Sequence, residues 1–154
     1  MTQNPSSANA ERGFHHTRVI AAPRARVLRA FSEPERLARW WGPAGFSSTF
    51  AQCDFRPGGA WRFVLHGPDG SDYPNENIFQ EIGPERVVIE HLATTGHHFI
   101  LTVGLADEGG SATRVEWAQV FDSAEERARV APFVPQANEQ NLDRLAAEVA
   151  RIAP

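Results

Sequence analysis

At residues 39–43 the chain reads Arg39-Trp40-Trp41-Gly42-Pro43, and this stretch constrains the fold more than any other. The residues before it predict helix. Gly42-Pro43 ends that helix, because proline lacks the next backbone donor and glycine tolerates the turn. Two large rings are thereby held at a helix end, where one can fill a core and the other can close a cavity mouth. The junction predicts that at least one ring lines a cavity, the alternative being that both fill the core.

Upstream of this junction the pattern predicts one strand followed by two helices. Phe14 to Ile20 alternates weakly, as a strand does, and Pro23 stands at a favourable first position of a helix. Ser32-Glu33-Pro34 interrupts the helical pattern that runs to Arg39. Ser32 is therefore expected to cap a second, shorter helix.

Downstream of the junction the hydrophobic period changes to two, which predicts strands. Turns rich in glycine and proline separate the expected strands, which cover residues 46–55, 61–66, 75–81, 87–92, 97–105 and 115–121. Short strands at regular spacing with tight turns indicate an antiparallel meander rather than a parallel sheet.

The last element is a long helix that begins at a capping box and ends near Ile152. Ser123 and Glu126 are spaced so that each side chain can accept from the backbone N–H of the other. Pro132 and Pro135 fall in the early turns of this helix and predict a kink or break there. The sequence does not specify the shape that this gives to the cavity mouth. The sheet and this helix must bury their apolar faces on each other, and the gap between them is the natural cavity. The expected fold class is therefore α+β, with a curved antiparallel sheet around a long C-terminal helix.

Composition excludes several classes of function. The net charge is −4 with no basic run, which argues against a nucleic-acid partner. All fifteen Lys and Arg positions are arginine. The absence of lysine excludes Schiff-base chemistry and a Walker-type phosphate loop, because each requires a lysine. No apolar stretch approaches the roughly 18 to 20 residues that span a bilayer, and the single cysteine, Cys53, fits a reducing compartment. We expect a cytoplasmic protein with a disordered tail over residues 1–13 and a single domain over residues 14–154.

Several motifs in a fixed order extend this reading from about residue 17 to residue 152. They are Ala22-Pro23, Arg39-Trp40-Trp41-Gly42-Pro43, Asp54-Phe55-Arg56-Pro57-Gly58-Gly59-Ala60-Trp61-Arg62-Phe63, Gly67-Pro68-Asp69-Gly70, Tyr73-Pro74-Asn75-Glu76 and Leu142-Asp143-Arg144-Leu145. With these motifs the chain resembles the activator of heat-shock-protein-90 ATPase homologue family, a branch of the START-like, helix-grip superfamily. The resemblance implies a helix-grip fold with a cavity between the sheet and the C-terminal helix. It leaves the activity open among co-chaperone domains, small-ligand carriers and, more distantly, polyketide cyclases and lipid-transfer domains.

The cavity is expected to be lined by inward-facing aromatic and polar side chains. His91 shares a face with Val87 and Ile89, where it would serve as acid, base or hydrogen-bond donor, or instead be a core histidine with satisfied hydrogen bonds. Inward-facing amides indicate a wet cavity or a ligand with polar groups, or else turn bonding near strand ends; they are Asn75, Asn77, Gln119, Asn138 and Asn141. The predicted lining residues are Trp41, Trp61, Phe63, His91, Trp117, Gln119 and Asn138.

Metal and cofactor chemistry finds no support in the sequence. The pairs His15-His16 and His97-His98 point to opposite faces of a strand, so neither pair chelates a metal by itself. We therefore expect no metal and no cofactor, and we assign no catalytic residue.

Three functional hypotheses remain. In the first, the cavity binds a small apolar or aromatic molecule. In the second, the outer surface acts on a chaperone ATPase in a stress response. In the third, a cyclase- or dehydratase-type enzyme uses His91 with amide donors, which requires polar groups that converge on one reacting atom. The residues favour binding over catalysis, and a homodimer is compatible with them.

Overall fold

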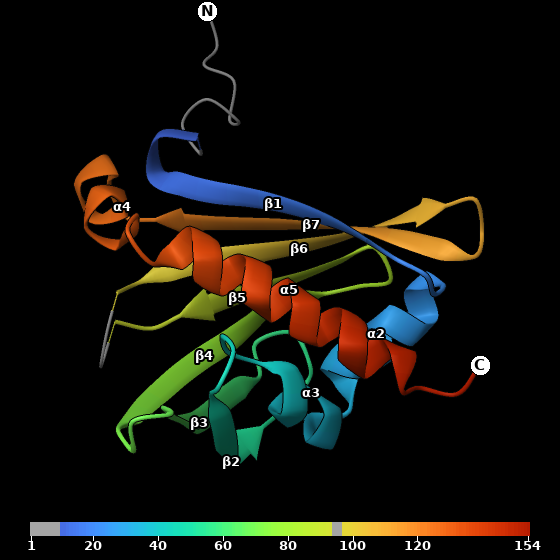
Figure 1. Ribbon diagram of the computed structural model, residues 1–154, viewed down its shortest axis with the longest axis horizontal. Helices are drawn as coiled ribbons and strands as arrows, with labels where there is room; N and C mark the ends of the chain where they lie inside the picture. The colour runs from blue at the N-terminus through green and yellow to red at the C-terminus, as the bar shows by residue number, and fades with distance from the viewer. Residues whose placement is uncertain (1–9, 94–96) are drawn as a thin grey trace, which may run out of the picture.

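The computed structural model describes residues 10–93 and 97–154. In chain order its elements are β1 (Gly13–Ile20), α2 (Arg24–Ser32), α3 (Pro34–Trp40), β2 (Ser47–Cys53), β3 (Ala60–His66), β4 (Asp72–Ile82), β5 (Arg86–His91), β6 (Phe99–Glu108), β7 (Ala112–Phe121), α4 (Ala124–Val130) and α5 (Val134–Ala150). The strands form one antiparallel sheet of order β1-β7-β6-β5-β4-β3-β2. Figure 1 shows α5 lying across one face of this sheet, with α4 beside its first turns and α2 and α3 beside its later turns. The predicted fold class and order of elements are confirmed.

The aromatic junction ends a helix as predicted. Helix α3 stops at Trp40, and Gly42 has a φ of 107°, a left-handed conformation that glycine adopts without steric penalty. The expected cap at Ser32 is wrong, because Ser32 is still the last residue of α2 and Glu33 takes the N-cap position of α3. The Glu33 side chain makes no cap bond and instead accepts from Arg29 and Arg36.

The predicted C-terminal helix is divided into two helices at its prolines. Helix α4 ends at Val130 and α5 begins at Val134, with Pro132 between them. Pro135 lies in the first turn of α5, where the missing N–H leaves no intrahelical bond unmade. The expected break is confirmed, and the axes of α4 and α5 run in different directions (Figure 1).

Only half of the predicted capping box forms at α4. Ser123 is the N-cap, and its Oγ accepts from the backbone N–H of Glu126 at 3.1 Å. The Glu126 carboxylate does not return to Ser123, because it binds His97 and Arg129 instead.

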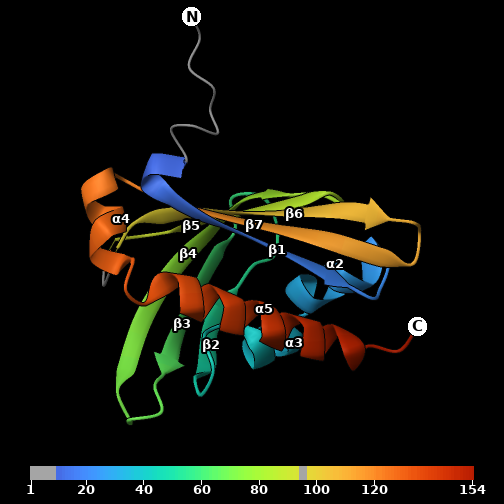
Figure 2. The same cartoon turned by 45° about the horizontal axis from the view of Figure 1, so that its top comes forward.

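Two β-bulges curve the sheet toward α5. The pairing register shifts between Phe50 and Gln52 in β2 and between Phe79 and Glu81 in β4. An extra residue on one strand bends that strand and increases its twist. Figure 2 shows β4, β3 and β2 turned steeply away from β1, β7 and β6, so that the sheet partly encloses α5.

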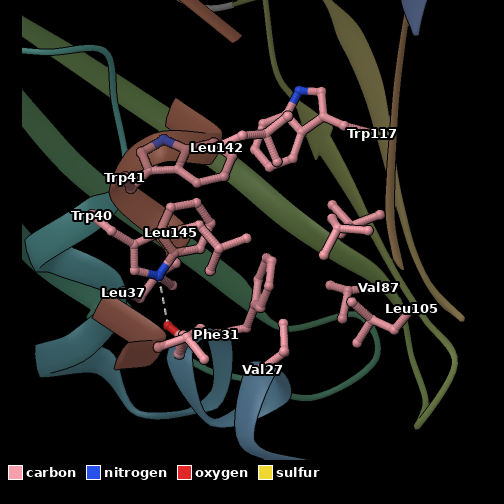
Figure 3. Close-up of a cluster of buried hydrophobic side chains, with 14 of the residues drawn as sticks. Val27, Phe31, Leu37, Trp40, Trp41, Val87, Leu105, Trp117, Leu142 and Leu145 are labelled. Atoms are coloured by element: carbon pink, nitrogen blue, oxygen red, sulfur yellow. Dashed lines mark hydrogen bonds between the residues drawn. The ribbon is translucent and has the colours of Figure 1, made fainter. Parts of the chain in front are cut away.

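The core lies where α2, α3 and α5 meet the inner face of the sheet (Figure 3). Phe31, Leu37 and Leu142 are completely buried there. Trp40 belongs to this core: its Nε1 donates to the Ala30 carbonyl at 2.8 Å, the dashed line in Figure 3. Trp40, the first ring of the Trp-Trp pair, is therefore a core residue.

The N-terminal boundary differs from the expected one. Residues 1–9 of the expected tail lie outside the described residues. Residues 10–12 are helical, and Gly13 already pairs with Val120 of β7, so the described fold begins before residue 14. Within residues 10–93 and 97–154, no helix combines the length and the apolar character needed to cross a membrane.

Candidate functional site

A pocket of about 250 Å³ lies between the sheet and the first turns of α5. The turn after α3, each strand from β3 to β7, and the start of α5 all contribute to its wall. Segments from residue 41 to residue 141 converge here, because the curved sheet brings its inner face toward the helix. Sequence reasoning places a cavity between the same two elements.

Five of the seven predicted lining residues meet in this pocket, namely Trp41, His91, Trp117, Gln119 and Asn138. Trp61 and Phe63 belong instead to the packed core. The Trp61 ring is fully buried between Phe63 and Phe79, with ring centroids 4.7 and 5.4 Å away. Trp41 packs against Trp61 at 4.8 Å and takes the place at the wall. The alternation of apolar and polar residues along a strand predicts which side chains face inward. It does not predict whether an inward ring lines the pocket or is packed beneath another ring.

His91 is held by its cross-strand neighbours on both sides. It pairs with Asn77 of β4 and with Phe99 of β6 in the sheet register. Its Nδ1 lies 2.8 Å from Asn77 Oδ1, and its ring stacks on Phe99 with centroids 4.7 Å apart. An amide oxygen only accepts, so Nδ1 carries the proton and the Nε2 lone pair is left as an acceptor.

Burial keeps the His91 ring neutral. Desolvation, with a smaller effect of positive charge on His98 and His97, lowers the pKa of His91 to about 4. At neutral pH the ring is therefore an uncharged hydrogen-bonding group. It is too weak a base at this pKa to favour proton abstraction near neutral pH.

An amide pair connects the other side of the pocket to α5. Asn138 Nδ2 donates to Gln119 Oε1 at 2.9 Å, and both side chains are buried. The bond joins α5 to β7 and orients the Gln119 amide nitrogen away from Asn138. Both residues could be predicted from the sequence, because each is a polar residue on an otherwise apolar face of its strand or helix.

Helix α5 also fixes the turn that carries Trp41. Asn141 Nδ2 donates to the Trp40 carbonyl at 2.9 Å, and its Oδ1 accepts from the Gly42 N–H at 3.3 Å. Arg144 Nη1 donates to the Gly42 and Pro43 carbonyls at 2.8 and 3.0 Å. A cation here also complements the negative end of the α3 dipole. The position of the Trp41 ring in the wall is thus set by side chains a hundred residues further along the chain.

Several apolar residues of the wall are not among the predicted lining residues, and they include Phe99, Leu101 and Phe133. Phe99 and Leu101 alternate on the inward face of β6, and that signal was present in the sequence. Phe133 is 56% exposed at the mouth of the pocket, in the connection between α4 and α5. Its position depends on the course of the chain after Pro132, which no local pattern specifies.

The remaining reactive residues are occupied elsewhere. His15 binds Glu116, whereas His16 binds Glu139 of α5, so the two neighbours have different partners. Burial, with the nearby Asp54 charge, raises the pKa of Cys53 to about 11, which keeps this thiol protonated near neutral pH. In the part of the chain that the structure describes, no cluster of His, Cys, Asp and Glu has an arrangement suited to a metal ion.

Comparison with known proteins relates the chain to one family. The family model described as Activator of Hsp90 ATPase homolog 1-like protein matches residues 21–150. No curated protein sequence matches. Among solved structures, a protein from Chromobacterium violaceum is 27% identical, with a TM-score of 0.74 over 92% of this chain and 99% of that one.

Two more distant structures share the fold. A protein from Arthrobacter aurescens is 22% identical, with a TM-score of 0.83 over 94% of this chain and 90% of that one. The AHSA1 protein from Silicibacter pomeroyi is 20% identical, with a TM-score of 0.70 over 90% of this chain and 97% of that one. At these identities the likeness describes the backbone architecture alone.

Proposed function

The chain belongs to the family of activator of Hsp90 ATPase homolog 1-like proteins, and from this premise we propose that it binds a small, mainly apolar molecule between its sheet and α5. The observation that carries the proposal is the hollow itself. It is a half-open pocket of about 250 Å³ beside a core whose large side chains are fully buried, and small-molecule sites are concave and mostly apolar.

The size and lining of the pocket support a ligand of one or two rings. A cavity of roughly 150 Å³ holds a benzene ring, so about 250 Å³ leaves room for a second ring or for substituents. Rings and aliphatic groups from Trp41, Phe99, Leu101 and Trp117 supply most of the contact area that such a molecule needs. Polar side chains from the sheet and from α5 also line the pocket, and such groups orient a ligand in most small-molecule sites; they are Asn75, Asn77, His91, Gln119, Asn138 and Asn141.

The proposal is tested by filling the pocket. Ala137 lines it from α5, whereas Ala147 is exposed on the same helix. Native mass spectrometry of the purified protein should reveal a retained small molecule or, after addition, a bound naphthalene derivative. Ala137→Phe should abolish this binding, and Ala147→Phe should leave it unchanged. Equal binding by both variants would place the molecule elsewhere and refute the proposal.

The family description favours a second candidate, in which the outer surface acts on a chaperone ATPase of the Hsp90 class. The two candidates are separated by the same pair of variants. If the outer surface is the functional part, Ala137→Phe should stimulate the ATPase as well as the unmodified protein does. Either function is proposed for the cytoplasm, where a single protonated thiol at Cys53 requires no disulfide partner.

A further inference from the structure

One donor and one acceptor remain free in the amide pair that joins α5 to β7. Asn138 Nδ2 donates to Gln119 Oε1, and neither Gln119 Nε2 nor Asn138 Oδ1 has a further hydrogen-bond partner among the described residues. Exchanging oxygen and nitrogen in both amides would reverse the bond between them but would still leave one donor and one acceptor. The pair therefore offers both kinds of hydrogen-bonding atom, whichever way its single bond runs.

The free nitrogen of this pair differs from the unpaired nitrogens of the aromatic cluster. Nε1 of Trp61 and Nε1 of Trp117 have no partner and no contact with solvent, so a missing partner alone does not mark a ligand contact in this protein. Gln119 Nε2 also lacks a partner, but it is not among the atoms that packing seals from solvent. A bound molecule can therefore reach it.

The pocket next to α5 is the space that this pair borders. Gln119 and Asn138 are each only 7% exposed, and both line this pocket. Gln119 also borders a hollow beside Gly13 and Phe14, but Asn138 does not line that hollow. A ligand group that binds both amides at once must therefore lie in the pocket next to α5.

The rest of the wall favours an uncharged ligand. None of the described residues that line the pocket is Asp, Glu, Lys or Arg, and burial lowers the pKa of His91, so its ring is neutral near pH 7. An ion would lose part of its hydration there without gaining a counter-ion, which is far less favourable than placing a neutral polar group in the same position.

We propose that the ligand carries an uncharged carboxamide-type group, whose oxygen accepts from Gln119 Nε2 and whose N–H donates to Asn138 Oδ1. The inference rests on the proposed function, because it names the chemistry of the molecule in the same pocket. A carboxamide matches the pair because it also holds one acceptor and one donor side by side. A ketone supplies the acceptor alone, and a carboxylate supplies acceptors together with a charge.

Three probes of nearly equal size test the inference: 2-naphthamide, 2-acetylnaphthalene, in which CH₃ replaces NH₂, and 2-naphthoate. Affinities are measured by NMR titration of the ¹⁵N-labelled protein. The amide should bind about tenfold more tightly than the ketone, the factor that one good hydrogen bond provides, and the naphthoate should bind most weakly. The side-chain NH₂ signals of Gln119 should shift downfield when the amide binds.

Two variants assign the preference to the pair. The double variant Gln119→Met, Asn138→Leu replaces both amides with apolar side chains of similar size, so neither is left unpaired by loss of the other, and the protein should fold. It should bind the amide and the ketone with nearly equal affinity. Asn75→Leu is the matched control, because Asn75 is an amide of the same wall that lies on β4, outside the pair, and it should preserve the tenfold preference. If the double variant does not fold, the shift of the Gln119 NH₂ signals in the unmodified protein decides the question.

The possible outcomes separate the inference from the proposed function. A ketone that binds as tightly as the amide, a naphthoate that binds best, or a preference that persists in the double variant would overturn the inference while leaving a ligand-binding pocket. Failure of all three probes to bind would count against the proposed function, and the inference would fall with it.

Discussion

Replacing His91 by glutamine should make the stability of the protein less dependent on pH. In the folded protein the pKa of His91 is lowered from 6.5 to about 4. Burial is the main cause of this shift, and positive charge on His98 and His97 is the lesser cause. Between these values the unfolded chain binds more protons than the folded one, so the free energy of unfolding decreases as the pH falls. Above about pH 6.5 His91 is neutral in both states and does not lower the free energy of unfolding. Between about pH 6.5 and pH 4 the free energy of unfolding decreases progressively, because the unfolded state takes up the proton first.

The expected magnitude follows from the size of the shift. One pKa unit corresponds to about 1.4 kcal/mol, so the full effect below pH 4 is about 3 kcal/mol, and the effect at pH 5 is about 2 kcal/mol. Glutamine does not titrate, and its amide nitrogen can still donate to Asn77 Oδ1. Between pH 7.5 and 5 the variant should therefore lose about 2 kcal/mol less stability than the unmodified protein.

The difference between the two proteins isolates His91 from the other histidines. Hydrogen bonds to Glu90 and Asp122 raise the pKa of His98, so its contribution has the opposite sign and favours the folded state as the pH falls. That contribution is present in both proteins, so the comparison removes it apart from the lesser part of the His91 shift that comes from positive charge on His98.

Urea unfolding followed by tryptophan fluorescence, at several pH values from 7.5 to 5, measures the two free-energy profiles. An NMR titration of the His91 ring protons gives its pKa independently, with an expected midpoint near 4. Parallel profiles for the unmodified protein and the His91→Gln variant, or a midpoint near 6.5, would show that the ring is not desolvated as the structure indicates.

Three further substitutions test the contacts that hold α5 and the turn between β2 and β3. Arg144→Met removes hydrogen bonds to carbonyls in the last turn of α3 and just after it, and should lower the free energy of unfolding by about 2 kcal/mol in urea titrations; an unchanged midpoint would contradict this role. Glu148→Gln removes a buried carboxylate from two arginines of α3 and should destabilise by about 2 kcal/mol, whereas Glu125→Gln, at an exposed pair, should have no measurable effect. Gly59→Ala would place its Cβ 1.9 Å from a backbone oxygen, so it should lower the melting temperature far more than Gly58→Ala, which meets open space at a positive φ; similar melting temperatures would refute the contact.

Local patterns in the sequence were sufficient to predict the strands and the helix ends at Gly42-Pro43 and Pro132, although not the cap between α2 and α3. Alternation placed Val87, Ile89 and His91 on one face because side chains of a strand point to opposite sides in turn. The Gly42-Pro43 stop and the proline break before α5 were predictable because each acts on its own backbone.

Features that depend on distant partners could not be predicted in this way. Pairing of β1 with β7 joins residues about a hundred positions apart and leaves no local signal. Glu126 abandons the capping box because His97, from another loop, competes for its carboxylate. Likewise Trp41 reaches the pocket and Trp61 does not, because the helix-end ring overlies the strand ring, and the period of a strand carries no information on depth.

The distribution of bonds along α5 has a consequence for exchange with solvent. Among the described residues, side-chain hydrogen bonds from α5 begin at Asn138 and continue through Glu148, whereas residues 134–137 make none and border the pocket beside Phe133. The first helical turn can therefore separate from the sheet without breaking a polar side-chain contact, while the rest of α5 stays attached. Local opening of that single turn would widen the pocket without requiring the rest of the fold to unfold.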